Sequence, residues 1–141
     1  MQLDILIRED VFSYREELIN DLSSIANLMK VKMIKTVLGS EGLSGLLLYD
    51  RKRALSHMIV NENDSDDKKI FTIGHEIGHF VLHKEELLNG KLCSVTERIG
   101  QLLSNNSDDV MEKEADEFSE KIIRLLLAIY KRRSDTQQMC K

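Results

Sequence analysis

Two histidines four residues apart, with a glutamate directly after the first, constrain this chain more than any other feature of its sequence. They are His75 and His79, with Glu76 between them, in an H-E-I-G-H segment. On an α-helix, residues i and i+4 lie one above the other on the same face. Both imidazoles can then direct a nitrogen toward one point, which is what a tetrahedral zinc ion requires.

The pattern around this segment predicts the helix that the histidines need. Apolar residues recur at helical spacing over residues 66–83 and predict a core-facing stripe. The stripe consists of Ile70, Ile73, Ile77 and Val81. The polar residues 61–67 before it offer N-cap side chains and negative charge for the helix N-terminus. Gly74 and Gly78 are poor helix formers, which suggests that something approaches this helix closely, either the sheet or a substrate.

The glutamate of the segment is a candidate general base. Glu76 projects about 100° round the helix from His75. It can therefore reach a metal-bound water without being a ligand itself. In this arrangement zinc lowers the pKa of the water and a carboxylate removes its proton.

A catalytic zinc site usually has three protein ligands and one open position, so a third ligand is needed. Glu112 and Asp116 are four apart and share one face of a predicted helix. We expect Glu112 to bind the metal and Asp116 to accept a hydrogen bond from a ligand histidine. Glu114 points about 160° away from Asp116 and ranks second as a ligand. His83 is one turn beyond His79, too far to complete the same tetrahedron, and is expected to face solvent or to contact a ligand from outside.

Two residues upstream are candidates for polarising a substrate carbonyl. Tyr49 and His57 both lie in segments predicted as strands and could border the cleft. His57 is also the one histidine that lies outside the helix predicted over residues 66–83. Ordinary packing or surface positions explain either residue at least as well.

The remaining pattern predicts an α+β fold in which a small, mostly antiparallel sheet packs against helices. Helices are expected over residues 10–29, 95–103 and 110–131, and strands over residues 31–37, 46–49 and 54–60. Glycines mark the turns between the strands, and the short connections favour antiparallel pairing. These glycines are Gly39, Gly42 and Gly45. The last helix has a predicted apolar face of Ala115, Phe118, Ile122, Leu125, Leu126 and Ile129.

Composition bounds the class of protein. The 141 residues fit one domain over residues 1–141, with the last ~8 residues expected to fray. A net charge of -4 argues against nucleic-acid binding as the main role. No apolar run approaches the ~20 residues of a membrane span. Two cysteines outside any C-x-x-C pair, and no signal-peptide pattern, indicate a reduced cytoplasmic compartment.

At these residues the chain resembles the ImmA/IrrE family of metallopeptidases. Residues 70–83, I-F-T-I-G-H-E-I-G-H-F-V-L-H, are similar to the family segment F-T-x-x-H-E-x-G-H-x-x-x-H. Residues 112–118, E-K-E-A-D-E-F, are similar to its segment E-x-E-A-[ND]-x-F. The resemblance extends roughly over residues 20–127. One departure follows Phe118, where the chain lacks the family's L-L-M-P-like stop.

The resemblance implies a zincin-like α+β fold with H-E-x-x-H on the central helix. It implies one zinc per chain, bound by His75, His79 and Glu112, with Glu76 as general base. The implied function is a cytoplasmic endopeptidase of phage or mobile-element type that cleaves a regulatory protein, a helix-turn-helix repressor, without binding nucleic acid directly. Two alternatives stay open, a non-catalytic repressor-binding regulator (an antirepressor) and a toxin–antitoxin component. The oligomeric state is not predicted.

Overall fold

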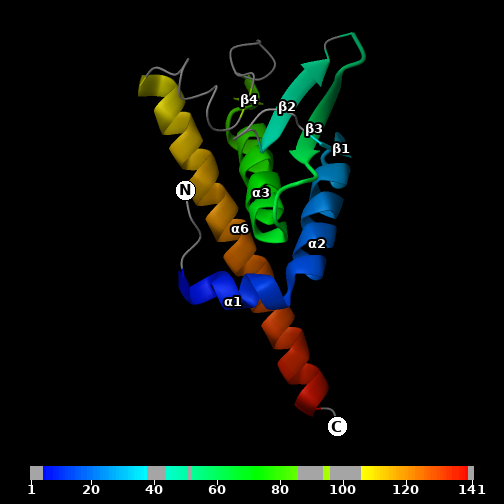
Figure 1. Ribbon diagram of the computed structural model, residues 1–141, viewed down its shortest axis with the longest axis vertical. Helices are drawn as coiled ribbons and strands as arrows, with labels where there is room; N and C mark the ends of the chain where they lie inside the picture. Colours follow the sequence, from blue (N-terminus) through cyan, green and yellow to red (C-terminus); the bar gives the residue numbers. More distant parts are fainter. Residues whose placement is uncertain (1–4, 38–43, 51, 86–93, 96–105, 140–141) are drawn as a thin grey trace.

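The computed structural model describes residues 5–37, 44–50, 52–85, 94–95 and 106–139, which form an α+β fold (Figure 1). The helices are α1 (Ile5–Ser13), α2 (Arg15–Leu28), α3 (Asp66–Leu82) and α6 (Asn106–Met139). The strands are β1 (Val31–Thr36), β2 (Gly45–Asp50), β3 (Leu55–Asn61) and β4 (Ser94–Val95). In the described part of the chain, no helix combines the length and apolar character needed to cross a membrane.

The sheet is mixed, with the strand order β1-β3-β2-β4. β2 pairs antiparallel with β3 and with β4, as the short connections predicted. β1 and β3 pair in parallel, however, which corrects the expectation for that pair. The reason is that β3 returns from the β2–β3 hairpin into the place beside β1. β3 thus lies between β1 and β2 in the sheet, runs antiparallel to β2 and runs parallel to β1.

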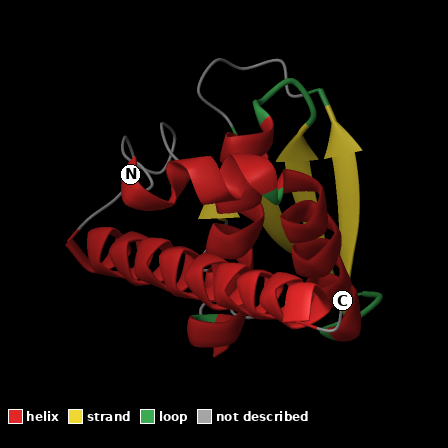
Figure 2. Ribbon diagram, turned by 90° about the horizontal axis from the view of Figure 1, so that it is seen from below, coloured by secondary structure: helices red, strands yellow, loops and turns green. Residues whose placement is uncertain are grey.

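One face of the sheet is buried under the helices (Figure 2). On β3, Ser56, Met58 and Val60 are buried, while the alternate residues are partly exposed. This alternation is the period of two expected of the strand predicted over residues 54–60. On β2, Leu47 pairs with Met58 on the buried side. α2 and α3 thus pack against the buried face of the sheet.

The N-terminal helical region is two helices rather than the predicted single one. α1 and α2 meet at Tyr14, whose backbone is not helical (φ -113°, ψ 24°). The ring of Tyr14 packs on the ring of Tyr130, with centroids 5.4 Å apart. The break lets Val11 of α1 and Leu18 of α2 both enter the core. A contact with the far end of the sequence therefore overrides the local helical period.

The buried face of α6 is shifted from the predicted one, and the helix extends past residue 131. Ala115 is buried as predicted, and Phe118, Ile122 and Leu126 are partly buried and pack against the core. The buried line is Ala115, Ser119, Ile123, Leu127 and Tyr130. Leu125 is 61% exposed and Ile129 is 37% exposed, so both predictions are corrected. Apolar residues lie on several sides of α6, so its sequence alone does not define the buried face. Packing against the other elements decides which side is buried. No glycine or proline follows residue 131, so nothing in the sequence ends the helix earlier.

Val81 and Val95 also differ from their predictions. Val81 belongs to the predicted stripe of α3 but is exposed, because it lies in the last turn beyond the core. Val95 is in β4, not in a helix, and the rest of the helix predicted over residues 95–103 lies outside the described residues. The predicted turns at Gly39 and Gly42 also lie outside them.

α3 and α6 pack closely because small residues face each other along their contact. A Cβ atom at residue 74 would clash with the hydroxyl of Ser119, whose own Cβ would be 3.1 Å away. A Cβ at residue 78 would lie 3.2 Å from the Cα of Ala115. Ser119 also donates a hydrogen bond to the carbonyl of Phe71, at 2.9 Å. The partner that closely approaches Gly74 and Gly78 is therefore α6, neither the sheet nor a substrate.

Gly74→Ala is expected to destabilise the protein although alanine favours helices. Overpacking costs about 1–3 kcal/mol, whereas the gain in helix propensity is about 1 kcal/mol. Urea denaturation should therefore show a lower free energy of unfolding. Glu117→Ala, at an exposed position of α6, is the matched control and should change little. A more stable Gly74→Ala variant would contradict the close packing.

Candidate metal centre

α3 places the two histidines of the H-E-x-x-H segment side by side and buries both. The helix begins after Ser65, whose hydroxyl accepts a hydrogen bond from the backbone N–H of Lys68. His75 is nearly buried and His79 is 0% exposed. Their ring centroids are 4.7 Å apart and the rings meet edge to face at 86°. Each ring presents its Nε2 atom to the same carboxylate on α6.

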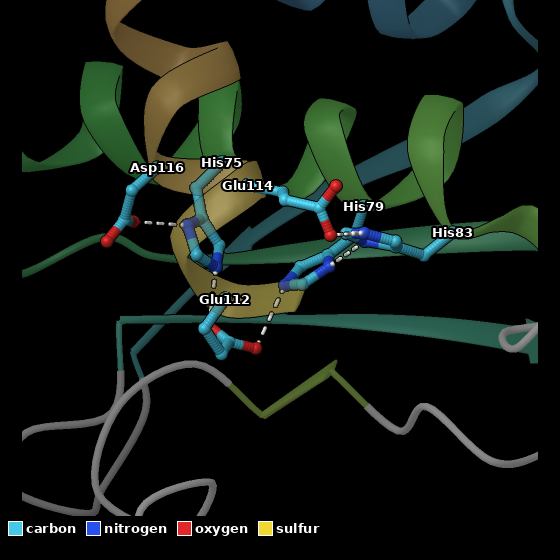
Figure 3. Close-up of polar contacts among 6 residues, drawn as sticks. All are labelled: His75, His79, His83, Glu112, Glu114 and Asp116. Atoms are coloured by element: carbon cyan, nitrogen blue, oxygen red, sulfur yellow. Dashed lines mark hydrogen bonds and ion pairs between the residues drawn. The ribbon is translucent and has the colours of Figure 1, made fainter. Parts of the chain in front are cut away.

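That carboxylate is Glu112, and it reaches both rings. Its Oε2 lies 2.9 Å from Nε2 of His75, and its Oε1 lies 2.9 Å from Nε2 of His79 (Figure 3). Each of the three residues can offer one ligand atom such that all three atoms lie within 4.8 Å of one another. The structure therefore brings together the three residues predicted as ligands, two from α3 and one from α6.

The environment of His75 fits a cation at this point. Nε2 of His75 is buried and, despite its short distance from Glu112, makes no hydrogen bond of acceptable geometry. Nδ1 of the same ring lies 2.7 Å from Oδ1 of Asp116. Because a carboxylate can only accept, Nδ1 carries the proton and donates it. Neutral His75 therefore has its Nε2 lone pair facing Glu112, and a metal ion between them would satisfy both atoms.

Glu76 is completely buried beside this group. Its side chain leaves α3 toward the start of β2, where a Cβ at residue 45 would lie 3.9 Å from its Cγ. Its negative charge is felt by His75 and raises the pKa of that ring. Glu76 is therefore a buried carboxylate within electrostatic reach of His75.

The other candidate site residues predicted from the sequence lie elsewhere. Oε1 of Glu114 lies 3.3 Å from Nε2 of His83, and the Glu114 side chain is 51% exposed. His57 lies on the face of β3 opposite the buried Ser56 and Met58. Tyr49 is paired with Ser56 on the helix-facing side of the sheet, where it packs against the core.

The structure decides between the two positions expected for His83. His83 is buried rather than facing solvent, and its Nδ1 lies 3.0 Å from Nδ1 of His79, so it contacts a candidate ligand from outside, as the second of the two expectations stated (Figure 3). The sequence contained the signal for this contact, since residues 79 and 83 are four apart on the helix. It contained no signal for Glu114 as the residue on the other side of His83.

Charge stabilises the cluster in the absence of a metal. Burial works to lower the pKa of His75, but the contacts with Asp116 and Glu112 and the charge of Glu76 outweigh it and raise this pKa to about 10. Burial works to raise the pKa of Glu112, but His75 and His79 outweigh it and lower this pKa to about 2. The opposite charges of His75 and Glu112 therefore stabilise each other.

Two histidines from one helix and one glutamate from another are the ligand set of a mononuclear site in which zinc serves hydrolysis. The chain belongs to the Peptidase M78 family: the family model, described as the IrrE N-terminal-like domain, matches residues 26–130. It is also similar to the metallopeptidase ImmA of Bacillus subtilis (strain 168), with 32% identity over 65 residues. That match covers 46% of this chain and 36% of the relative.

The zinc content of variants should show whether Glu112 or Glu114 is the third ligand. We expect about one zinc per chain in the wild type, lost in His79→Ala and Glu112→Gln. Glu114→Gln should keep the full stoichiometry, because the Glu114 carboxylate points to His83 rather than to the convergence of ligand atoms. Elemental analysis of purified protein measures this. A Glu112→Gln variant with full zinc and a Glu114→Gln variant without it would reverse the assignment.

Zinc binding at pH 7 should release about one proton, because Nε2 of His75 must lose its proton to coordinate and the pKa of His75 is about 10. The apparent zinc affinity should rise about tenfold per pH unit above neutrality and level off as the pH approaches this pKa. Calorimetric titration in buffers of different ionisation enthalpy counts the protons. Asp116→Asn removes the contact that contributes most to raising the pKa of His75, so zinc binding to this variant should release fewer protons.

The same two shifts set the stability of the metal-free protein. A raised pKa of His75 contributes stability that is fully present below pH 6.5 and is lost as the pH rises through about 10. A lowered pKa of Glu112 contributes stability present above pH 4.5 and lost as the pH falls through about 2. Both contributions to stability are therefore complete between pH 4.5 and pH 6.5.

Proposed function

We propose that this chain is a zinc-dependent endopeptidase with a zincin-like arrangement of its H-E-x-x-H helix. The observation that carries the proposal is the convergence of ligand atoms from His75, His79 and Glu112 within 4.8 Å, with Glu76 buried beside them. Membership of the M78 peptidase family supports it. We propose one zinc per chain, since the three residues form a single group.

The residues have separate roles in this proposal. When bound, zinc would lower the pKa of water and polarise a carbonyl oxygen. Glu76 accepts the proton of the attacking water and passes it to the nitrogen of the departing amine as the peptide bond breaks. Asp116 holds His75 in the tautomer whose Nε2 is free to coordinate, through the 2.7 Å hydrogen bond to Nδ1. A purely structural metal site would have no use for Glu76.

We propose that the substrate is a regulatory protein in the cytoplasm, a helix-turn-helix repressor whose cleavage relieves repression. The support is the family resemblance of residues 70–83 and 112–118, together with the similarity to a relative named as the metallopeptidase ImmA. A phage or another mobile element as the source follows from the same resemblance.

Glu76→Gln should keep the metal and lose the activity. The change preserves size but removes the base, and loss of a general base costs about 10²–10⁴-fold in rate. Expression in the organism that encodes the protein, followed by mass spectrometry of protein N-termini, should reveal new termini with the wild type and none with the variant. Glu117→Gln, the same exchange at an exposed position, should behave as the wild type.

A transcriptional reporter distinguishes cleavage from binding. If Glu76→Gln relieves repression as well as the wild type does, the chain acts by binding a repressor, and the endopeptidase proposal is wrong. Growth arrest on expression of either form alone would point instead to a toxin.

A further inference from the structure

His83 lies where α3 ends and links two residues of different helices. It caps α3, and its backbone N–H donates to the carbonyl of His79 at 2.8 Å. Its ring is buried between His79, with Nδ1 atoms 3.0 Å apart, and Glu114, whose Oε1 is 3.3 Å from Nε2 of His83. Figure 3 shows the two imidazoles and the Glu114 carboxylate in a continuous row.

The protons in this row can be assigned from the outer end inward. Glu114 is a carboxylate and can only accept, so it favours the tautomer of His83 that carries its proton on Nε2. Nδ1 of His83 then presents a lone pair to Nδ1 of His79, and two lone pairs cannot face each other at 3.0 Å. With His83 in this tautomer, Nδ1 of His79 is the donor, and the 2.9 Å contact of His79 Nε2 with Glu112, which an Nε2–H would otherwise fill, is left to a cation.

This assignment leaves Nε2 of His79 as the atom free to coordinate. In the singly protonated ring, Nε2 holds a lone pair that points at Oε1 of Glu112, 2.9 Å away. Two electron-rich atoms at that distance need a cation beside them. The tautomer set by Glu114 and His83 is thus the one that a metal ligand needs.

We propose that His83 and Glu114 are positioning residues that hold His79 in its coordinating tautomer and ring orientation. The inference rests on the proposed function, because it assumes a metal at His75, His79 and Glu112. It gives His79 what Asp116 gives His75, a hydrogen-bonded chain that ends in a carboxylate of α6. The carboxylate reaches His75 directly but reaches His79 through a second imidazole.

Zinc affinity measured by competition with a chromophoric chelator tests the chain. His83→Phe keeps the ring volume and removes both nitrogens, and should weaken zinc binding by about 10–100-fold, as is usual for partners that orient a ligand. Glu114→Gln should weaken it less, because its contact is longer and half-exposed. The double variant should be no weaker than His83→Phe alone, since the two residues act in series. Glu117→Gln, on the same helix, should match the wild type.

A spectroscopic signature separates positioning from packing. In the zinc-bound wild type, a ¹⁵N-labelled histidine spectrum should show His79 with its proton on Nδ1, in slow exchange with water. This signal should broaden or vanish in His83→Phe. Glu114→Gln, at a half-exposed site, keeps the test valid if the buried His83→Phe variant fails to fold.

The outcomes separate this inference from the proposed function. A wild type that binds no zinc would overturn both. If the wild type binds zinc, and His83→Phe and Glu114→Gln bind it with the affinity of the wild type and leave the His79 signal unchanged, the positioning role alone is overturned. The peptidase proposal then stays intact.

Discussion

The contact between α3 and α6 is the interaction on which the rest of the structure depends. The candidate ligand atoms come from both helices, so their convergence requires the two axes to lie close together in one register. Gly74 and Gly78 on one side, and Ser119 and Ala115 on the other, allow this approach. Side chains of ordinary size along this line would push Glu112 away from the histidines. Metal sites tolerate displacements of only about 0.5 Å before they lose function.

The features that the sequence predicted correctly are those with a local period. The helix over residues 66–83 and the alternation of Ser56, Met58 and Val60 both follow from spacings of 3.6 and 2 residues. The pairing of Glu112 and Asp116 with the histidines follows from the same spacing, applied to two helices at once. Geometry brings these residues together, while their catalytic and ligand roles stay predictions.

The features that the sequence could not provide depend on contacts between distant segments. The break at Tyr14 follows from its packing on Tyr130, which local periodicity does not contain. The buried face of α6 was ambiguous because apolar residues flank it on several sides, and the choice comes from small residues facing Gly74 and Gly78. The link from Glu114 through His83 joins residues 31 apart in sequence, so no local pattern indicates it.

Tyr130, in the C-terminal half of α6, has contacts that bear on the candidate metal centre. The hydroxyl of Tyr130 donates to Oδ2 of Asp21 at 2.6 Å and also lies 3.1 Å from the carbonyl of Glu17. Tyr130 follows Asp116 by fourteen residues, about 21 Å along the helix axis. A continuous helix transmits an axial displacement with little loss over such a distance. The contacts of Tyr130 with α2 therefore hold α6 along its axis at a second place, about four helical turns from Asp116.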